Sequence, residues 1–64
     1  MTKYVTYYVI DTRTNRIINA IHTSQGKLKA KKIATSMIDG DFMDVDENPP
    51  KQMLERYQYW NERP

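Results

Sequence analysis

Two runs of β-forming residues near the N-terminus are apolar on both sides, and this limits the folds open to the chain. Residues 4–10 and 16–23 are rich in Tyr, Val, Thr and Ile, the residue types that suit a pleated strand. Between the runs, Asp11 can accept hydrogen bonds from the backbone that follows it, and Asn15 tolerates a positive φ. The sequence therefore predicts a β-hairpin whose loop is residues 12–15, with Asn15 in the left-handed conformation.

Pairing Asp11 with Arg16 sets the predicted register of this hairpin. The pairs that follow are Ile10 with Ile17, Val9 with Ile18, Tyr7 with Ala20 and Thr6 with Ile21. One face then carries Val5, Tyr7, Val9, Ile18 and Ala20, and the other carries Tyr4, Tyr8, Ile10, Ile17 and Ile21. Because an antiparallel sheet usually leaves one side wet, a hairpin with two apolar faces is expected to be covered on both, by two helices or by a partner. The sequence does not decide which face meets the helices.

A first helix is predicted over residues 25–38. Thr23 and Ser24 offer hydroxyl caps for its first turn, and Gly40 is suited to a left-handed residue just past its end. Its apolar stripe follows helical spacing and comprises Ala30, Ile33, Ala34, Met37 and Ile38. Leu28 lies outside this stripe, among lysines.

The remaining elements complete an α+β fold. A short third strand is predicted over residues 41–46. Asn48-Pro49-Pro50 then starts a second helix that runs to about Glu62, with Met53, Leu54, Tyr57 and Trp60 on its apolar stripe. The order is β-β-α-β-α, which indicates one small domain over residues 1–64: an antiparallel sheet, made of the hairpin and the third strand, packed with two helices.

Length and composition exclude several classes of protein. A chain of 64 residues buries only about 60% of its unfolded surface, and a core of this size supplies about 3–5 kcal/mol. With no cysteine and one histidine, neither a disulfide nor a structural zinc site is expected. The longest apolar or aromatic run, residues 7–10, is far too short to span a bilayer, and no signal peptide is recognised. We therefore expect a cytoplasmic protein without membrane contact or cofactor.

Charge is divided unevenly along the chain. Residues 1–35 hold seven basic residues and one acid, seven minus one or +6, whereas residues 36–64 hold three basic residues and seven acids, three minus seven or −4. The basic part suggests a DNA or RNA interface made of Arg13, Arg16, Lys27, Lys29, Lys31 and Lys32. Tyrosines on the hairpin could stack on unpaired bases beside it. The alternative is that a lysine-rich helix face serves only solubility.

The acidic part has three interpretations. Asp44, Asp46, Asn48 and Glu55 match positions 1, 3, 5 and 12 of a calcium loop. Position 6 of such a loop requires glycine, but Pro49 stands there and fixes φ near about −65°, so no metal site is expected. Five acids, Asp39, Asp41, Asp44, Asp46 and Glu47, could instead mimic spaced phosphates or form a solvated strand edge.

No residue pattern indicates catalysis. His22 has neither a carboxylate nor a nucleophile at a telling distance in the sequence, and a domain this small has little room for a closed pocket. We therefore predict no catalytic residue and no enzyme activity.

Apolar residues outside the expected core favour a protein partner. Leu28 and Tyr59 lie away from the helix stripes, and the hairpin has one apolar face more than a monomer needs. The predicted protein-binding residues are Tyr4, Tyr8, Ile10, Leu28 and Tyr59. The first hypothesis is thus a regulatory or inhibitory protein that binds another protein, the second is the nucleic-acid interface, and homodimerisation through the sheet is compatible with either.

The hairpin and the helix after it also carry a resemblance. The segment from Tyr8 to Ile18, followed by Ala20-Ile21-His22-Thr23-Ser24 and a lysine-rich helix, resembles the hairpin-then-helix unit of many small bacteriophage and bacterial accessory proteins. It covers residues 1–38, and Asn15 replaces the glycine that usually closes the turn. The resemblance implies an early product that binds and redirects a host protein, and it transfers no functional residue.

Overall fold

The hairpin forms around the predicted turn. In the computed structural model, which describes residues 3–61 and the side chains of residues 3–59, β1 (Val5–Asp11) and β2 (Arg16–Thr23) pair antiparallel. The Asp11 carbonyl accepts from the Asn15 N–H at 2.8 Å, and its carboxylate accepts from the Arg13 N–H at 2.9 Å. Asn15 has a φ of 55°. The loop and its left-handed residue are therefore confirmed.

A β-bulge changes the register beyond the first two pairs. Asp11 pairs with Arg16 and Ile10 with Ile17, as predicted, but Val9 pairs with Asn19 because Ile18 is the extra residue of the bulge. From there Tyr7 pairs with Ile21, Tyr8 with Ala20 and Thr6 with His22. The predicted pairs of Val9, Tyr7 and Thr6 are therefore wrong by one residue.

The bulge improves the partition between core and surface. In the uninterrupted register Ile18, Ala20 and His22 would share a face with Val9; with the bulge, that face receives Asn19, Ile21 and Thr23 instead. Ile21 and Thr23 are buried there, while His22 is exposed on the other side. Since burying an imidazole without a partner is costly, the shifted register is the more stable one.

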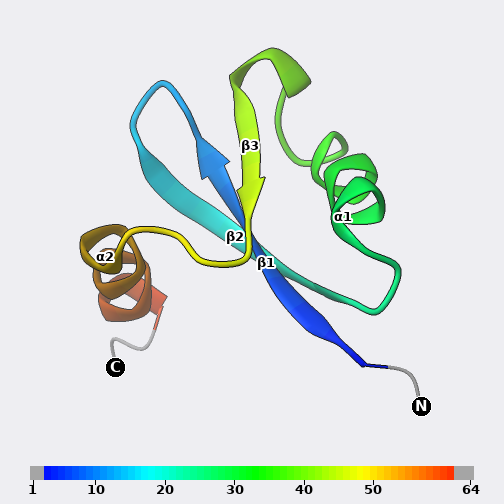
Figure 1. Ribbon diagram of the computed structural model, residues 1–64. Coiled ribbons are helices and arrows are strands. Elements are labelled where there is room, and N and C mark those ends of the chain that lie inside the picture. Colours follow the sequence, from blue (N-terminus) through cyan, green and yellow to red (C-terminus); the bar gives the residue numbers. More distant parts are fainter. Residues whose placement is uncertain (1–2, 62–64) are drawn as a thin grey trace.

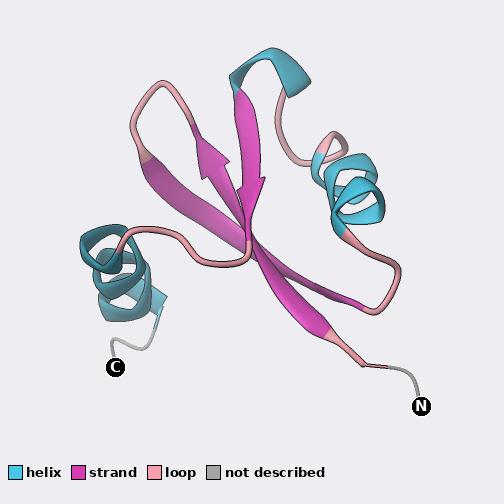
Figure 2. Cartoon of the chain, in the orientation of Figure 1, coloured by secondary structure: helices cyan, strands magenta, loops and turns pink. Residues whose placement is uncertain are grey.

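The third strand completes the sheet on the other side of β1. β3 (Met43–Asp46) pairs antiparallel with β1, so the order in the described part of the chain is β2-β1-β3. It begins two residues later than predicted because a short 3-10 helix, η1 (Gly40–Phe42), precedes it (Figure 2). The Asp39 carboxylate accepts from the Asp41 N–H at 3.1 Å and caps η1.

The first helix is shorter than predicted at both ends. α1 spans Lys27–Ala34 and starts from Gly26, whose φ of 91° and ψ of 178° suit glycine alone. The Thr23 hydroxyl accepts from the Gln25 N–H at 3.1 Å, so it stabilises the turn before the helix and does not cap the helix. At the other end Thr35 donates its hydroxyl to the Lys32 carbonyl at 2.6 Å, which competes with continued helix.

The second helix follows the prolines as predicted. α2 spans Lys51–Asn61, and the Leu54 N–H donates to the Pro50 carbonyl at 3.0 Å. Met53, Leu54 and Tyr57 are half-buried along its apolar stripe. The Trp60 side chain and Glu62, which the sequence assigned to the same helix, lie outside the described residues.

The two helices cover opposite faces of the sheet (Figure 1). α1 packs on the face whose core consists of Tyr7, Val9, Ile21, Ala30, Ala34 and Val45. α2 packs mainly on β2 at the other face, where Ile10 and Ile17 are buried and the rings of Tyr8 and Tyr57 meet edge to face with centroids 6.0 Å apart. The predicted α+β, β-β-α-β-α arrangement is confirmed. Within residues 3–61, no helix is long and apolar enough to cross a membrane.

Candidate functional site

One side of α1 forms a wall of a surface groove. Leu28, Lys31 and Lys32 follow the spacing i, i+3, i+4 on this side, and Thr35 extends the row one position past the helix end. Leu28 is 81% exposed, more than any other large apolar side chain that the structure describes. The row is therefore separate from Ala30 and Ala34, which α1 buries against the sheet.

The groove lies between α1 and the segment that leads into β3. It is open along one side and has a volume of ≈630 Å³. Its lining is mostly apolar and comprises Leu28, Lys29, Lys31, Lys32, Thr35, Gly40 and Met43. Lysine contributes the methylene part of its side chain to such a lining while its ammonium group stays in water. The result is an apolar surface with lysine ammonium groups along its α1 side, while the exposed Asp39 and Asp41 lie next to Gly40 on the other wall.

The opposite wall is low because Gly40 has no side chain. A Cβ placed on Gly40 would lie 3.7 Å from Cγ2 of Thr35, so a side chain at position 40 would reach ordinary contact with the α1 wall. Met43 supplies the deeper part of this wall and also packs against the core of the α1 face. Met43 therefore connects one wall of the groove to the folded core, and α1 forms the other wall.

The charge division of the sequence becomes a division in space. Asp44 and Asp46 pair with Ile10 and Tyr8, which places them on the face of the sheet opposite α1. Asp39 and Asp41 are exposed on either side of Gly40. The basic surface therefore belongs to α1, and the acids of β3 point to the other side.

Arg13 of the hairpin turn makes contacts within the molecule. The Arg13 guanidinium lies 4.6 Å from the centre of the Phe42 ring, and its Nε donates to Asp11 Oδ1 at 3.3 Å. The side-chain hydrogen bond from Arg13, followed by the Arg13 backbone N–H, lowers the pKa of Asp11 below its ordinary value of 3.8. Of the predicted nucleic-acid set, Lys29, Lys31 and Lys32 thus come together at the groove, whereas Arg13 is paired with Asp11.

The predicted protein-binding residues do not form one surface. Ile10 is buried and Tyr8 is half-buried against Tyr57, so α2 covers the sheet face that these two residues were expected to offer to a partner. Tyr4 is exposed but stacks on His22, with ring centroids 5.2 Å apart. Leu28 and Tyr59 are exposed on helices that flank opposite faces of the sheet.

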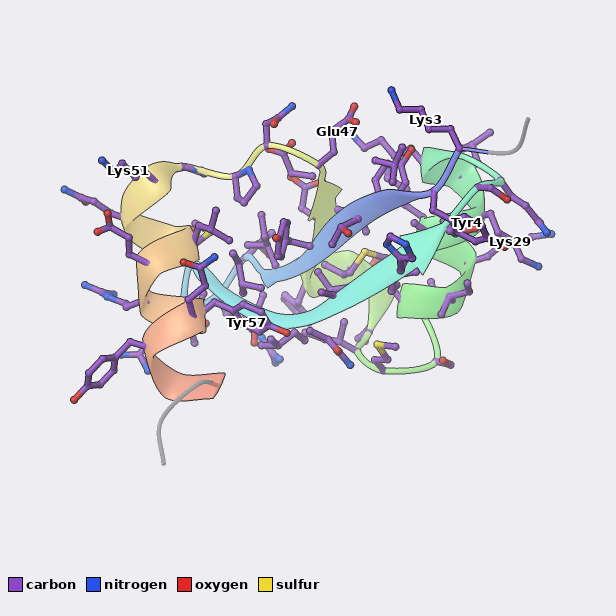
Figure 3. The ribbon with its side chains drawn as sticks, turned by 90° about the horizontal axis from the view of Figure 1, so that it is seen from below. Lys3, Tyr4, Lys29, Glu47, Lys51 and Tyr57 are labelled. Atoms are coloured by element: carbon purple, nitrogen blue, oxygen red, sulfur yellow. The ribbon has the colours of Figure 1, made fainter. Side chains whose placement is uncertain are left out.

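Figure 3 shows the separation of these regions. Tyr57 points from α2 toward the sheet, whereas Lys29 on α1 lies at the end of the molecule away from Lys51. A second, smaller cavity of ≈200 Å³ lies between the hairpin loop and α2, lined by Asn15, Pro50, Gln52, Met53 and Arg56. Its volume is below the range of about 300–1,000 Å³ typical of ligand sites.

The described side chains show no arrangement typical of catalysis. His22 Nδ1 lies 3.0 Å from the Thr6 hydroxyl at the exposed end of the hairpin, and no hydrogen bond or ion pair among the described residues joins His22 to a carboxylate. No group of three or more His, Asp and Glu side chains in the described part of the chain could hold a metal ion. The carboxylates of Asp44 and Asp46 each accept a nearby backbone N–H, from Val45 at 2.8 Å and Asn48 at 2.9 Å.

The sequence identified Leu28 and the lysines but missed the other wall of the groove. The spacing of positions 28, 31, 32 and 35 was a usable signal, because an apolar residue at the start of a basic row departs from an ordinary solvated face. Gly40 and Met43 carried no such signal, because their position depends on η1. No protein-family model, curated protein or solved structure matches this chain.

Proposed function

We propose that this protein is a small non-enzymatic regulator or inhibitor that acts in the cytoplasm by binding another protein, and that the groove beside α1 is its binding surface. The exposure of Leu28 carries this proposal. At 81% exposed, Leu28 adds little to the folded core, yet it lies in an apolar groove. An exposed apolar side chain that is continuous with an apolar groove adds to a surface of the kind that marks protein interaction sites.

Most other exposed apolar side chains have contacts within the molecule. The Phe42 ring contacts the Arg13 guanidinium through a cation–π interaction. The Met37 sulfur accepts a hydrogen bond from the Asn19 amide at 3.3 Å, and the Tyr4 ring stacks on His22. These contacts explain the presence of those residues without a partner. Leu28 differs from them in its greater exposure, 81%, and in lining the groove.

The edge strands are less suited to binding. A strand edge attracts a partner strand through free backbone N–H groups. On β2 the Ala20 N–H donates to Asn19 Oδ1 at 2.8 Å, and on β3 the Val45 N–H donates to Asp44 Oδ1 at 2.8 Å. The bulge at Ile18 further interrupts the β2 edge. Side-chain contact at the groove is therefore a better route to a partner than strand addition.

Site-specific cross-linking in the native cells tests the proposal. A photoreactive leucine analogue, which keeps an aliphatic side chain of similar size, replaces Leu28 in one version of the full chain and Gln58, exposed on α2, in a control version. We expect a defined protein adduct from position 28 and none from position 58. Equal labelling from both positions, or no protein adduct from position 28, contradicts the proposal.

Nucleic-acid binding is the second candidate, favoured by the exposure of Lys27, Lys29, Lys31 and Lys32 along α1. Neutralising phosphates with lysine releases counterions, so such binding weakens steeply as salt rises. A titration with single- and double-stranded oligonucleotides at about 50 mM and about 200 mM salt measures this directly. Binding that falls steeply between the two salts supports this candidate, and no binding at the lower salt eliminates it.

A further inference from the structure

We infer that the groove beside α1 receives a short acidic segment of the partner protein, anchored by an aliphatic or aromatic side chain. This inference rests on the proposed function, because it names the chemistry of the partner at the same surface. The groove consists of an apolar base and a basic rim, and each part selects a different feature of the ligand.

The rim selects negative charge. Lys31 and Lys32 line the groove on consecutive positions of α1, and Lys29 adds a third ammonium group. The nearest acids in the sequence, Asp39 and Asp41, flank Gly40 on the other wall, and Asp39 is engaged in capping η1. No salt bridge involves the three groove lysines among the described residues. A partner carboxylate can therefore bind them without displacing an internal ion pair.

The base selects an apolar side chain. Leu28 and Met43 face the groove from α1 and from β3, and the lysine methylenes extend the apolar lining between them. The groove is shallow and wide open to solvent, so a bound side chain would be covered on one side only. Because the groove is open along one side, a side chain projecting from another polypeptide can enter it while its backbone stays outside.

The same lining disfavours a nucleic acid. Proteins hold unpaired bases by stacking them on aromatic rings, and no aromatic side chain is among the described residues that line the groove. Phosphates would satisfy the lysines but leave Leu28 and Met43 without an apolar partner. An acidic peptide with one large apolar residue satisfies both parts.

The groove accommodates only a short segment. Leu28 and Thr35 are seven positions apart, which corresponds to about 10 Å along a helix axis. About three residues of extended chain, or two turns of helix, cover this length. The ligand is therefore a local motif within the partner and not a large surface.

Selection from a random library of 12-residue peptides tests the inference on the full chain. We expect the enriched peptides to carry net negative charge and at least one Leu, Ile, Met, Phe or Trp. Synthetic copies are then titrated by fluorescence anisotropy against the wild type and variants. Leu28→Ala should weaken binding about tenfold or more, since an anchor loses its apolar contact.

A matched pair of charge reversals isolates the rim. Lys31→Glu and Lys27→Glu change the net charge equally and lie on the same helix, but only Lys31 lines the groove. We expect Lys31→Glu to weaken peptide binding about tenfold or more and Lys27→Glu by less than about threefold. Circular dichroism establishes that both variants are folded before the titrations.

Any of the following results would overturn the inference: no enriched peptide, enriched peptides that are neutral or basic, or equal effects of Lys31→Glu and Lys27→Glu. Displacement of a selected peptide by single-stranded DNA would also overturn it and assign the groove to nucleic acid. If a protein cross-links from position 28 while the selected peptides are not acidic, the proposed function stands and this inference falls. If no protein cross-links from that position, the proposed function itself is wrong.

Discussion

The two glycines of the chain occupy different kinds of backbone conformation. Gly26 has φ 91° and ψ 178°, a region that residues with a Cβ rarely enter, and it connects β2 to α1. Gly40 has no positive φ and begins η1. The sequence assigned the left-handed role to Gly40 because it placed the helix end at residue 38, four residues too late.

This contrast predicts opposite effects of alanine at the two positions. Gly26→Ala should lower the free energy of unfolding by about 1–3 kcal/mol, entirely through backbone strain, because no atom lies within 4 Å of a Cβ at this site. Gly40→Ala should raise it by up to about 1 kcal/mol, because the alanine restricts the unfolded chain and meets only Thr35. Urea denaturation measures both. A larger loss for Gly40→Ala than for Gly26→Ala would contradict the described conformations.

Asp11 predicts how the hairpin responds to acid. Its pKa in the folded protein lies below 3.8, chiefly because the Arg13 side chain and the Arg13 backbone N–H donate to its carboxylate. A lowered pKa means that the carboxylate stabilises the fold above pH 3.8 and loses this effect as the pH falls through the folded value. Asp11→Asn keeps an acceptor but not the charge.

We therefore expect Asp11→Asn to be less stable than the wild type at pH 7 and to approach the wild type as the pH falls below 3.8. Urea denaturation at a series of pH values provides the comparison, and the difference between the two proteins removes the contribution of the other carboxylates. A constant difference across the series would show that the charge of Asp11 is not involved.

At the scale of the elements, the bulge in β2 separates two adjacent isoleucines. Ile17 is 7% exposed and pairs with Ile10 under α2, whereas Ile18 is the extra residue and is 43% exposed. In an uninterrupted hairpin both would face apolar layers, on opposite sides of the sheet. The bulge therefore makes one of the pair dispensable.

Alanine substitutions measure this difference. Ile17→Ala should lower the free energy of unfolding by about 2–4 kcal/mol, because it removes buried methylene groups. Ile18→Ala should change it by less than about 1 kcal/mol, since most of that side chain is already in water. Similar losses at both positions in urea denaturation would mean that β2 pairs without a bulge.

The sequence predicted the elements better than their ends. Hairpin, helices and third strand follow from local signals: Asp11 and Asn15 at the turn, the apolar stripe of α1, and the prolines before α2. The bulge could not be predicted in this way, because it depends on which of Ile21 and His22 the α1 face can bury. Likewise η1 depends on the Thr12 N–H, which donates to the Phe42 carbonyl at 3.0 Å across a long stretch of sequence.

At the scale of the whole molecule, helices of the same chain cover both apolar faces of the hairpin. The sequence left open whether two helices or a partner would cover them, and α1 and α2 take opposite sides. The surplus apolar surface is therefore not the sheet face of Tyr8 and Ile10 but the side of α1 that carries Leu28. The sequence predicted Leu28 as a binding residue but could not predict the groove, whose second wall comes from residues 40–43.

Three lysines and an apolar surface coincide at this groove. The acids of β3 lie on the far side of the sheet, so the proposed acidic partner would meet the α1 lysines and the apolar contact together, with the exposed Asp39 and Asp41 beside Gly40 on the other wall. Long-range attraction and short-range burial then act at the same place.

The most direct test is the yield of cross-linked partner from a photoreactive residue at position 35, the far end of the groove, in two alanine variants. Leu28→Ala should reduce the yield about tenfold, and Ile18→Ala, which removes a comparable exposed side chain elsewhere, should leave it within about twofold. Urea denaturation should place Leu28→Ala within about 0.5 kcal/mol of the wild type. Equal yields from the two variants would show that Leu28 is not the anchor and that the groove is not the binding surface.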